Sequence, residues 1–426
     1  MTTNNTNLSL GEKLMYVRKA KGLSLENVAD AIHSSASHVR RIELSETKCD
    51  HATLAKIKEY MAIKNAPLLE HELRIYKERI WVWNELITTA RMAEAEDMRQ
   101  ELAVILALPF ERELYLLYIM TECRIYLTMS NLPPVEERLA EAEPFISEAG
   151  DVVRFLYYRC KGLMHAFGGD NNAALQYFLK CLNCDYNNIM PAFSVYYIIG
   201  RIYISLGKLY NSIKYLERAV TEYTGDREHH SFAAARVDLA ICYIYVKDYD
   251  KAVELCNAAI IQAESIKNTD HLGPAKATLA LCIFKMGKHD EALKLMDEAL
   301  ELFQKHTPDY KVHLINKTRF LVDMKNYSQA EELSKQILPL IEDNDILTML
   351  YTTECHRMTL NNAESIEYLE NTAIPSFMAI GDLASMYMAL QICEALEAHY
   401  TKKRSKMKAL TMTATIRDIY GKMFMG

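Results

Sequence analysis

A pattern of helix, turn and second helix recurs five times between about residues 155 and 340, and it limits the possible folds more than any other feature of the chain. The second helix of each copy opens near one small residue, and these residues are Ala174, Ser212, Ala252, Ala292 and Ala330. They stand 38, 40, 40 and 38 residues apart. A period in this range is typical of a solenoid of helix pairs, whereas an ordinary helical bundle has no fixed period.

Two more positions keep the same register in every copy. Twelve residues before the small residue stand Gly162, Gly200, Ala240, Ala280 and Thr318. Seven residues after it stand Cys181, Ala219, Ala259 and Ala299, with Ile337 as the exception. Small side chains at fixed offsets let paired helices approach closely. The pattern resembles the tetratricopeptide repeat, lengthened by a few residues per unit, so we expect an all-α chain with a right-handed superhelix of such repeats.

Composition agrees with long helices. Half of the 426 residues are hydrophobic, while glycine and proline number only 14 and 10. No apolar run is long enough to span a membrane, and the polar first residues are unlike a signal peptide. We therefore expect a cytoplasmic protein that does not enter the membrane.

The ten cysteines form no regular framework. Most fall on apolar helical faces, where a reduced cysteine acts as a small hydrophobe. Cys181 and Cys184 form a lone Cys-x-x-Cys pair, for which a zinc or redox role is the alternative, but no second pair accompanies it. We expect packing cysteines with reduced thiols.

Charge is distributed unevenly along the chain. Residues 1–64 contain ten Lys or Arg and seven Asp or Glu, whereas the remaining residues contain 39 and 49. A basic segment of +3 joined to a body of −10 is the asymmetry expected when only the first segment meets nucleic acid.

Residues 8–63 have the pattern of a compact set of short helices, with serine and glycine signals at their ends. We predict helices over residues 9–20, 25–32, 35–43 and 52–61. The segment resembles the helix-turn-helix of the phage-repressor (Xre/Cro) family. The matching residues are Leu14, Val17, Arg18, Lys19, Gly22, Leu23, Ser24, Val28, Ala29, Ser35, Ser37, Val39, Arg41, Ile42 and Glu43. The resemblance implies an ion pair between Arg18 and Glu43. Leu25 departs from the family, in which a glutamine at this place helps to clamp a phosphate.

The third of these helices carries the predicted DNA contacts. In a helix-turn-helix its N-terminal part enters the major groove. We predict base contacts from Ser35, Ser37 and His38, and phosphate or guanine contacts from Arg40 and Arg41. The alternative for the two arginines is a solvated basic face. One such head offers few base contacts, so we expect a dimer on paired half-sites of double-stranded DNA.

A curved array of helix pairs presents a concave groove lined by the first helix of each pair. Repeat arithmetic places six predicted peptide-binding residues there: Arg159, Tyr197, Arg201, Asp238, Asn316 and Arg319. Asn and Arg side chains can hold a peptide's main chain and its terminal carboxylate. For each single residue, a surface polar group or an ion pair between repeats is an equal alternative.

We predict three parts in the chain. Residues 1–65 form the helix-turn-helix DNA-binding domain, residues 66–90 a linker helix, and residues 91–426 the repeat domain for peptide binding and dimerisation. Trp81 and Trp83 are expected to pack where the head meets the array. Two closing helices are expected over residues 375–399 and 402–422.

The sequence contains no defensible catalytic signature. It has no phosphate-binding glycine loop, no His-Glu-x-x-His and no nucleophile elbow. His229 and His230, expected in a loop, have no third ligand candidate nearby, so a metal-dependent hydrolase is the weakest alternative. We expect no catalytic residue, no metal and no cofactor.

A repressor-type head ahead of stretched tetratricopeptide repeats resembles the peptide-pheromone receptors of the Rap/Rgg/NprR/PlcR/PrgX (RRNPP) group. The resemblance implies a cytoplasmic quorum-sensing transcription regulator, a homodimer through its repeats, that binds a short signalling peptide in the groove and thereby alters DNA binding. The alternative is a peptide-controlled interaction regulator whose repeats sequester a partner protein such as a response regulator.

Overall fold

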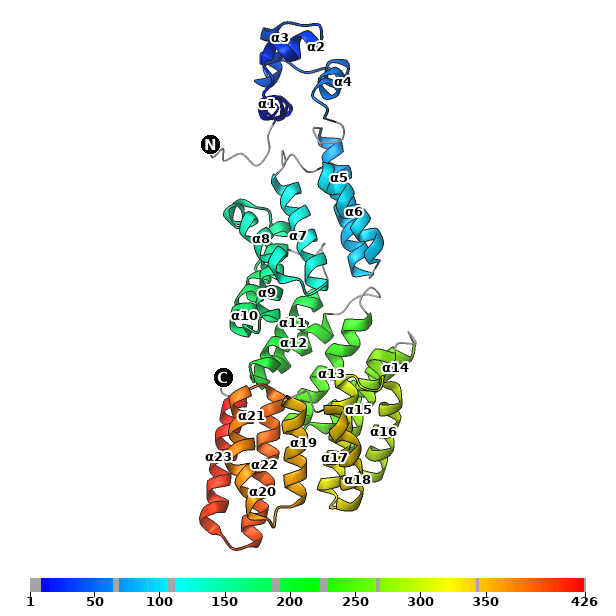
Figure 1. The fold of residues 1–426 in the computed structure, drawn as a ribbon, viewed down its shortest axis with the longest axis vertical. Coiled ribbons are helices and arrows are strands. Elements are labelled where there is room, and N and C mark those ends of the chain that lie inside the picture. Colours follow the sequence, from blue (N-terminus) through cyan, green and yellow to red (C-terminus); the bar gives the residue numbers. More distant parts are fainter. Residues whose placement is uncertain are drawn as a thin grey trace. The chain divides into compact units, whose positions relative to one another are not determined.

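The computed structural model divides the chain into two compact units, unit 1 (residues 1–186) and unit 2 (residues 187–426), coloured along the sequence in Figure 1. Within the described residues all regular secondary structure is helical, which confirms the all-α prediction. The described residues are 9–63, 69–89, 91–105, 112–185, 192–222, 229–265, 269–341 and 345–424. The predicted domain boundaries at residues 65 and 90 lie outside these ranges.

Unit 1 begins with four short helices. They are α1 (Leu10–Ala20), α2 (Leu25–Ala31), α3 (Ala36–Glu43) and α4 (His51–Tyr60). The polar residue before each helix, namely Ser9, Ser24, Ser35 or Asp50, accepts a hydrogen bond from a backbone N–H of the first turn. A small apolar core that includes Val17, Val39 and Ile57 holds the four helices together. The predicted bounds are confirmed to within one residue.

The rest of unit 1 consists of longer helices and one short 3-10 segment. They are α5 (Glu70–Thr88), α6 (Met92–Ile105), α7 (Arg112–Thr128), α8 (Leu132–Ala142), η1 (Glu143–Glu148), α9 (Asp151–Phe167) and α10 (Asn171–Cys181). Trp83 of α5 is fully buried, and its ring centroid lies 5.4 Å from that of Tyr118 in α7. Trp83 is therefore a packing residue, as expected, and its described ring contact is with α7; Trp81 is only partly buried.

Unit 2 continues as pairs of neighbouring helices. They are α11 (Ala192–Ser205), α12 (Leu209–Thr221), α13 (His229–Tyr245), α14 (Tyr249–Ser265), α15 (Thr269–Lys285), α16 (His289–Leu302), α17 (Pro308–Asp323), α18 (Tyr327–Ile341), α19 (Asp345–Met358), α20 (Ala363–Tyr368), the π-helical segment η3 (Leu369–Ala373), α21 (Ile374–Ile380), α22 (Leu383–Lys402) and α23 (Lys406–Phe424). Of the helices described in either unit, none has both the length and the apolar character of a membrane span.

The small residues of the repeat lie where helices pack most closely. The residues at the start of the second helices, Ala174, Ser212, Ala252, Ala292 and Ala330, are all fully buried. A methyl group on Gly162 would stand 2.7 Å from the ring of Phe178, and one on Gly200 would stand 2.7 Å from Leu216. The helices of these pairs therefore approach closely because the first helix has no side chain at the crossing. The predicted close approach is confirmed.

The turn inside each pair has one recurring backbone conformation. The residue five positions before the small residue has a positive φ in all five copies: Gly169 (81°), Gly207 (70°), Lys247 (64°), Gly287 (85°) and Lys325 (61°). Positive φ favours glycine, but a lysine is held there twice. The turn thus repeats as exactly as the small residues do, although its sequence varies.

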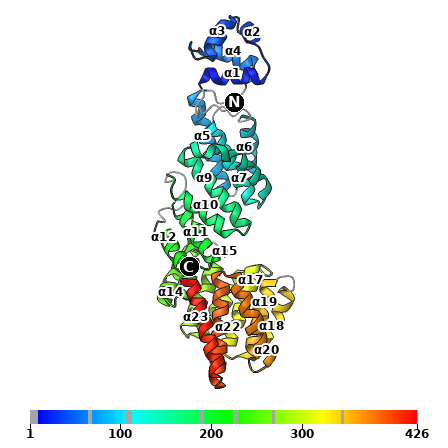
Figure 2. The same cartoon turned by 90° about the vertical axis from the view of Figure 1, so that its left-hand side faces the viewer.

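The predicted closing helix over residues 375–399 is wrong in one respect, because the chain breaks it into α21 and α22. Gly381 ends α21 in the left-handed conformation, with φ of 75°. The Asp382 side chain then caps α22 by accepting a hydrogen bond from the backbone N–H of Ser385 at 2.7 Å. These are ordinary stop and start signals for helices. Helices α22 and α23 lie side by side in Figures 1 and 2.

Candidate functional site

Helix α3 presents most of its predicted contact residues to solvent. Ser35 caps the helix, its side chain accepting a hydrogen bond from the backbone N–H of His38 at 3.2 Å. Ser37, Arg40 and Arg41 are exposed, and His38 is half-buried. Neither arginine forms an ion pair with another residue of the described ranges. The opposite side of α3 is anchored in the core of the head, so the exposed side is free to meet a ligand.

A two-pronged ion pair holds α3 against α1. Arg18 donates from Nε to Glu43 Oε1 at 2.6 Å and from Nη2 to Oε2 at 2.8 Å. Its third contact is from Nη1 to the carbonyl oxygen of Leu23 at 2.9 Å. The hydrogen bond to Glu43 raises the pKa of Arg18 above its ordinary value. The ion pair expected from the phage-repressor resemblance is confirmed, and Leu25 packs against the same core.

Three predicted peptide-binding residues come together between α11 and α13. Arg201 Nε lies 3.7 Å from Asp238 Oδ2, and its guanidinium carbon lies 5.9 Å from the centroid of the Tyr197 ring. Burial raises the pKa of Asp238 to about 6, although Arg201 and a hydrogen bond from Tyr197 act in the opposite direction. The Arg201 side chain is 65% exposed and that of Asp238 is 24% exposed. This cluster therefore combines a recessed carboxylate with a reachable guanidinium.

Helix α17 carries two more predicted residues, and they differ in exposure. Asn316 is half-buried, with Nδ2 3.5 Å from His313 Nδ1. Burial lowers the pKa of His313 to about 4. Arg319 is only 8% exposed, and its Nε donates to Glu354 Oε1 of α19 at 3.0 Å. For Arg319 the alternative stated above, an ion pair between repeats, is thus present in the structure.

The ion pair of Arg319 belongs to a larger buried network between α17 and α19. Glu354 also accepts from Arg357 Nη1 at 2.6 Å, and Arg357 Nη2 donates to Asp323 Oδ1 at 2.6 Å. Asp323 and Glu354 therefore offset the charges of two buried guanidinium groups. Removal of any one partner would leave an uncompensated buried charge, so the network couples α17 to α19.

Arg159 lies in unit 1, whereas the other five predicted peptide-binding residues lie in unit 2. It is half-buried on α9, and its Nε is enclosed without a hydrogen-bond partner in the described chain. Its positive charge acts against the effect of burial on the pKa of the Cys160 and Cys181 thiols.

Sequence reasoning missed a row of residues at the ends of the first helices. Tyr245, Lys285 and Asp323 each stand five positions after the small residue of their helix, and we call them the end row. Tyr387 of α22 lies against it, with its ring centroid 4.4 Å from that of Tyr245 and 5.8 Å from Lys285 Nζ. Burial lowers the pKa of Lys285. The same repeat arithmetic, continued one helical turn further, would have found these residues.

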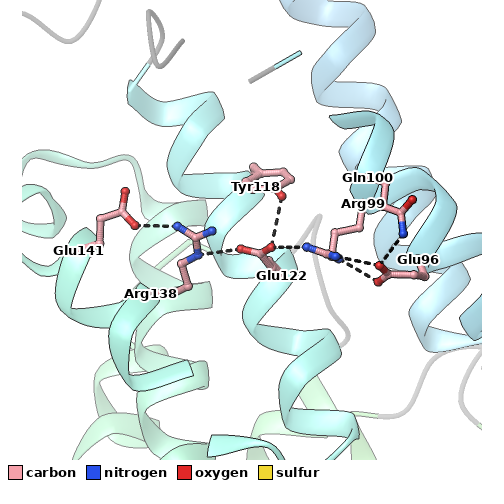
Figure 3. Close-up of polar contacts among 7 residues, drawn as sticks. All are labelled: Glu96, Arg99, Gln100, Tyr118, Glu122, Arg138 and Glu141. Carbon is pink, nitrogen blue, oxygen red and sulfur yellow. Dashed lines mark hydrogen bonds and ion pairs between the residues drawn. The ribbon is translucent and has the colours of Figure 1, made fainter. Parts of the chain in front are cut away.

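Unit 1 contains a second buried polar network, centred on Glu122 of α7 (Figure 3). The carboxylate is 1% exposed and lies between two guanidinium groups, Arg99 of α6 at 2.9 Å and Arg138 of α8 at 2.8 Å. The outer sides of the two arginines contact Glu96 at 2.7 Å and Glu141 at 2.9 Å. One carboxylate thus links three successive helices through charge-assisted contacts.

The weakest sequence hypothesis, a metal-dependent hydrolase at His229 and His230, gains no support. Helix α13 begins at His229, so both residues belong to its first turn instead of the expected loop. Their side chains lie outside the described part of the chain. Among the residues whose side chains are described, no three His, Cys, Asp or Glu groups are arranged to hold a metal ion.

Comparison with known proteins agrees with this architecture. The tetratricopeptide-repeat family model matches residues 193–223. The transcriptional activator NprA of Geobacillus stearothermophilus is 21% identical over 396 residues, which cover 89% of this chain and 95% of NprA. This match extends over nearly the whole of both proteins.

Solved structures resemble the fold at low sequence identity. The apo form of the quorum sensor NprR from B. thuringiensis has a TM-score of 0.65 at 16% identity, covering 81% of this chain and 98% of that one. NprR in complex with its cognate peptide NprX gives 0.60 at 15%, with 81% and 99% covered. A Rap protein complexed with competence and sporulation factor gives 0.64 at 15%, with 82% and 98% covered. The chain is thus similar in sequence to NprA, and in fold to NprR and Rap, which are tetratricopeptide-repeat proteins of the RRNPP group.

Proposed function

We propose that the protein is a transcription regulator whose α1–α4 head binds double-stranded DNA and whose repeats bind a short signalling peptide that controls this binding. The observation that carries the proposal is the match to the activator NprA over 95% of that protein's length. The match covers 89% of this chain, so it is not confined to the repeats of one unit.

The DNA part of the proposal is supported by the exposed side of α3. Helices α2 and α3 act as a helix-turn-helix, with Ser35, Ser37 and His38 toward base edges and with Arg40 and Arg41 toward phosphates or guanine. The Arg18–Glu43 pair fixes the angle of α3, so the contact residues are already ordered before DNA binds. A homodimer would place two such heads on paired half-sites.

The peptide part is supported by the Tyr197, Arg201 and Asp238 cluster. A peptide's carboxylate would pair with the exposed Arg201 guanidinium, and a backbone N–H or ammonium group would pair with Asp238. The Tyr197 ring adds apolar area beside them. NprR has been solved with its cognate peptide NprX, which supports a peptide as the ligand of a related array.

The peptide is tested by calorimetric titration of the full chain with synthetic peptides from the C-termini of small secreted reading frames beside the gene. We expect micromolar or tighter binding that Arg201→Ala weakens at least about tenfold, as for a lost charge-assisted contact. Arg218→Ala is the matched control, because Arg218 is also an exposed arginine with a neighbouring acid, Glu222. Equal weakening by both variants would remove Arg201 from the site.

DNA binding is tested with a fragment selected from a random duplex library. We expect the double variant Arg40→Ala/Arg41→Ala to reduce the slope of log K against log salt concentration by about 2, one unit for each lost phosphate contact. The control Lys402→Ala/Lys403→Ala removes the same charge from unit 2. If no duplex is enriched and a partner protein is retained instead, the interaction regulator becomes the better function.

A further inference from the structure

The α11–α12 turn differs from the other turns of the array in what surrounds its glycine. At the equivalent turn position Lys247 and Lys325 have φ of 64° and 61°, so this conformation does not by itself require glycine. A methyl group on Gly169 or Gly287 would meet nothing within 4 Å. At Gly207 it would overlap the carbonyl oxygen of Gly381 and the terminal methyl of Met386. Gly207 is therefore the turn glycine whose missing side chain makes room for another part of the chain.

The part that packs on Gly207 is the turn between α21 and α22. Gly381 breaks the helix there, and Asp382 starts the next one. The break directs α22 back to α11 and α23 back to α12, at the first helix pair of unit 2. The end of unit 2 thus packs on its first helix pair, and at Gly207 the contact is turn against turn.

The closed arrangement has a consequence for the first helices. Tyr387, one turn into α22, stacks on Tyr245 and lies under the Lys285 ammonium group. Tyr245, on which Tyr387 stacks, is 8% exposed. By contrast, the Arg201 side chain of α11 is 65% exposed. The protein's own helix therefore covers part of the surface that the first helices offer to a ligand.

We propose that the contact of Gly207 with Gly381 and Met386 is a latch that keeps unit 2 closed. In the closed state Tyr387 stays packed on the end row and excludes a ligand from it. Opening the latch withdraws Tyr387 and extends the accessible surface from Arg201 toward Tyr245 and Lys285. The link to peptide rests on the function proposed above. A peptide that contacts the whole surface binds the open state better, so it shifts the protein toward that state.

The test compares two single-methyl variants of the full chain. Gly207→Ala and Gly287→Ala each place a methyl group on a residue with a positive φ, 70° and 85°, so both carry backbone strain of the same kind. The overlap with the α21–α22 turn arises for Gly207→Ala, whereas the position of Gly287 is open. Small-angle scattering gives the radius of gyration, and hydrogen exchange gives the protection of α22. Tyr387→Ala is a second variant that weakens the closed state without adding an atom.

We expect Gly207→Ala and Tyr387→Ala to enlarge the radius of gyration and to speed exchange in α22, while Gly287→Ala matches the wild type. The peptide found by titration should bind both opened variants about fivefold more tightly, within the usual range of such coupling. Identical scattering and exchange for Gly207→Ala and Gly287→Ala would overturn the latch. Opening accompanied by weaker peptide binding would overturn the proposal that Tyr387 excludes the peptide from the end row. If no peptide binds any variant, the proposed function fails, and scattering and exchange still decide the latch.

Discussion

Arg18 and Glu43 meet through two parallel hydrogen bonds of 2.6 Å and 2.8 Å, across 25 residues of sequence. Their side chains are 11% and 5% exposed, so the pair is largely removed from water. Two-pronged geometry and a further bond to the Leu23 carbonyl oxygen satisfy most of the guanidinium. The pair thus determines how α3 sits on α1.

Removal of one partner should therefore destabilise the head. We expect Glu43→Ala to cost about 3 kcal/mol, because it leaves a buried guanidinium without its carboxylate. The readout is hydrogen exchange of the α1–α4 amides in the full chain, which measures this segment separately from the repeats. The double variant Arg18→Met/Glu43→Leu is the control, and it should regain most of the loss. A double variant as unstable as Glu43→Ala would contradict this view of the pair.

The network around Glu122 predicts that removal of a buried carboxylate costs more stability than removal of an exposed one. Glu122→Gln should destabilise unit 1 by about 2 kcal/mol, because it removes the charge shared by two arginines that keep partial access to water. Glu96→Gln removes an outer carboxylate that is 37% exposed and should cost less than about 1 kcal/mol. Urea unfolding followed by exchange in α6–α8 measures both. Equal costs would show that burial of Glu122 does not determine its contribution.

The close crossing at Gly162 predicts a reversal of the usual effect of alanine. In an open helix, Gly→Ala stabilises by roughly 0.5 to 1 kcal/mol. Gly162→Ala should instead destabilise by about 1 to 3 kcal/mol, because the methyl group would stand 2.7 Å from the Phe178 ring. Adding Phe178→Leu should recover part of this loss, as thermal unfolding would reveal. A stabilised Gly162→Ala protein would mean that the two helices separate easily.

The raised pKa of Asp238 predicts how the stability of the folded protein changes with pH. Its pKa rises from the ordinary 3.8 to about 6 in the folded protein, chiefly through burial. Between these pH values the folded state binds more protons than the unfolded state, so the stabilising effect of the protonated acid is present below about pH 4 and is lost as the pH rises through 6.

Asp238→Asn should therefore become more stable than the wild type as the pH increases from 4 to 7, by on the order of 1 kcal/mol. The difference between the two proteins is the quantity to measure, because the lowered pKa of His313 gives the opposite slope in the same range. Chemical unfolding of both proteins at several pH values gives this difference. A constant difference would mean that Asp238 titrates as an exposed acid.

The repeat register could be obtained from sequence because it depends on fixed spacing, and the Arg18–Glu43 pair because the resemblance to the phage-repressor head implies it. Gly200 and Ser212 mark one crossing by their size alone, and the pair follows a motif that fits within one short head. The break at Gly381 was also available, since glycine followed by a capping aspartate is a local signal. The uninterrupted helix predicted there ignored it.

The contacts between distant repeats were not available in this way. Tyr245 meets Tyr387 only because the array closes, and no spacing rule relates residues so far apart. The burial of Arg319 depends likewise on Glu354, which lies in the next repeat. A period identifies which residues lie on the first helices, but it does not say which of them another helix will cover.

The buried cysteines allow the opening of individual helix pairs to be followed by chemical labelling. Thiols occur on α7, α9, α10, α13, α14, α15, α19 and α22, and all of these except Cys355 of α19 are buried. Burial also raises the pKa of these thiols, so each is protected from alkylation both by lack of access and by lack of thiolate. Mass spectrometry after alkylation for a set time would therefore measure how fast each helix pair opens. The native cysteines are sufficient, so no cysteine needs to be introduced.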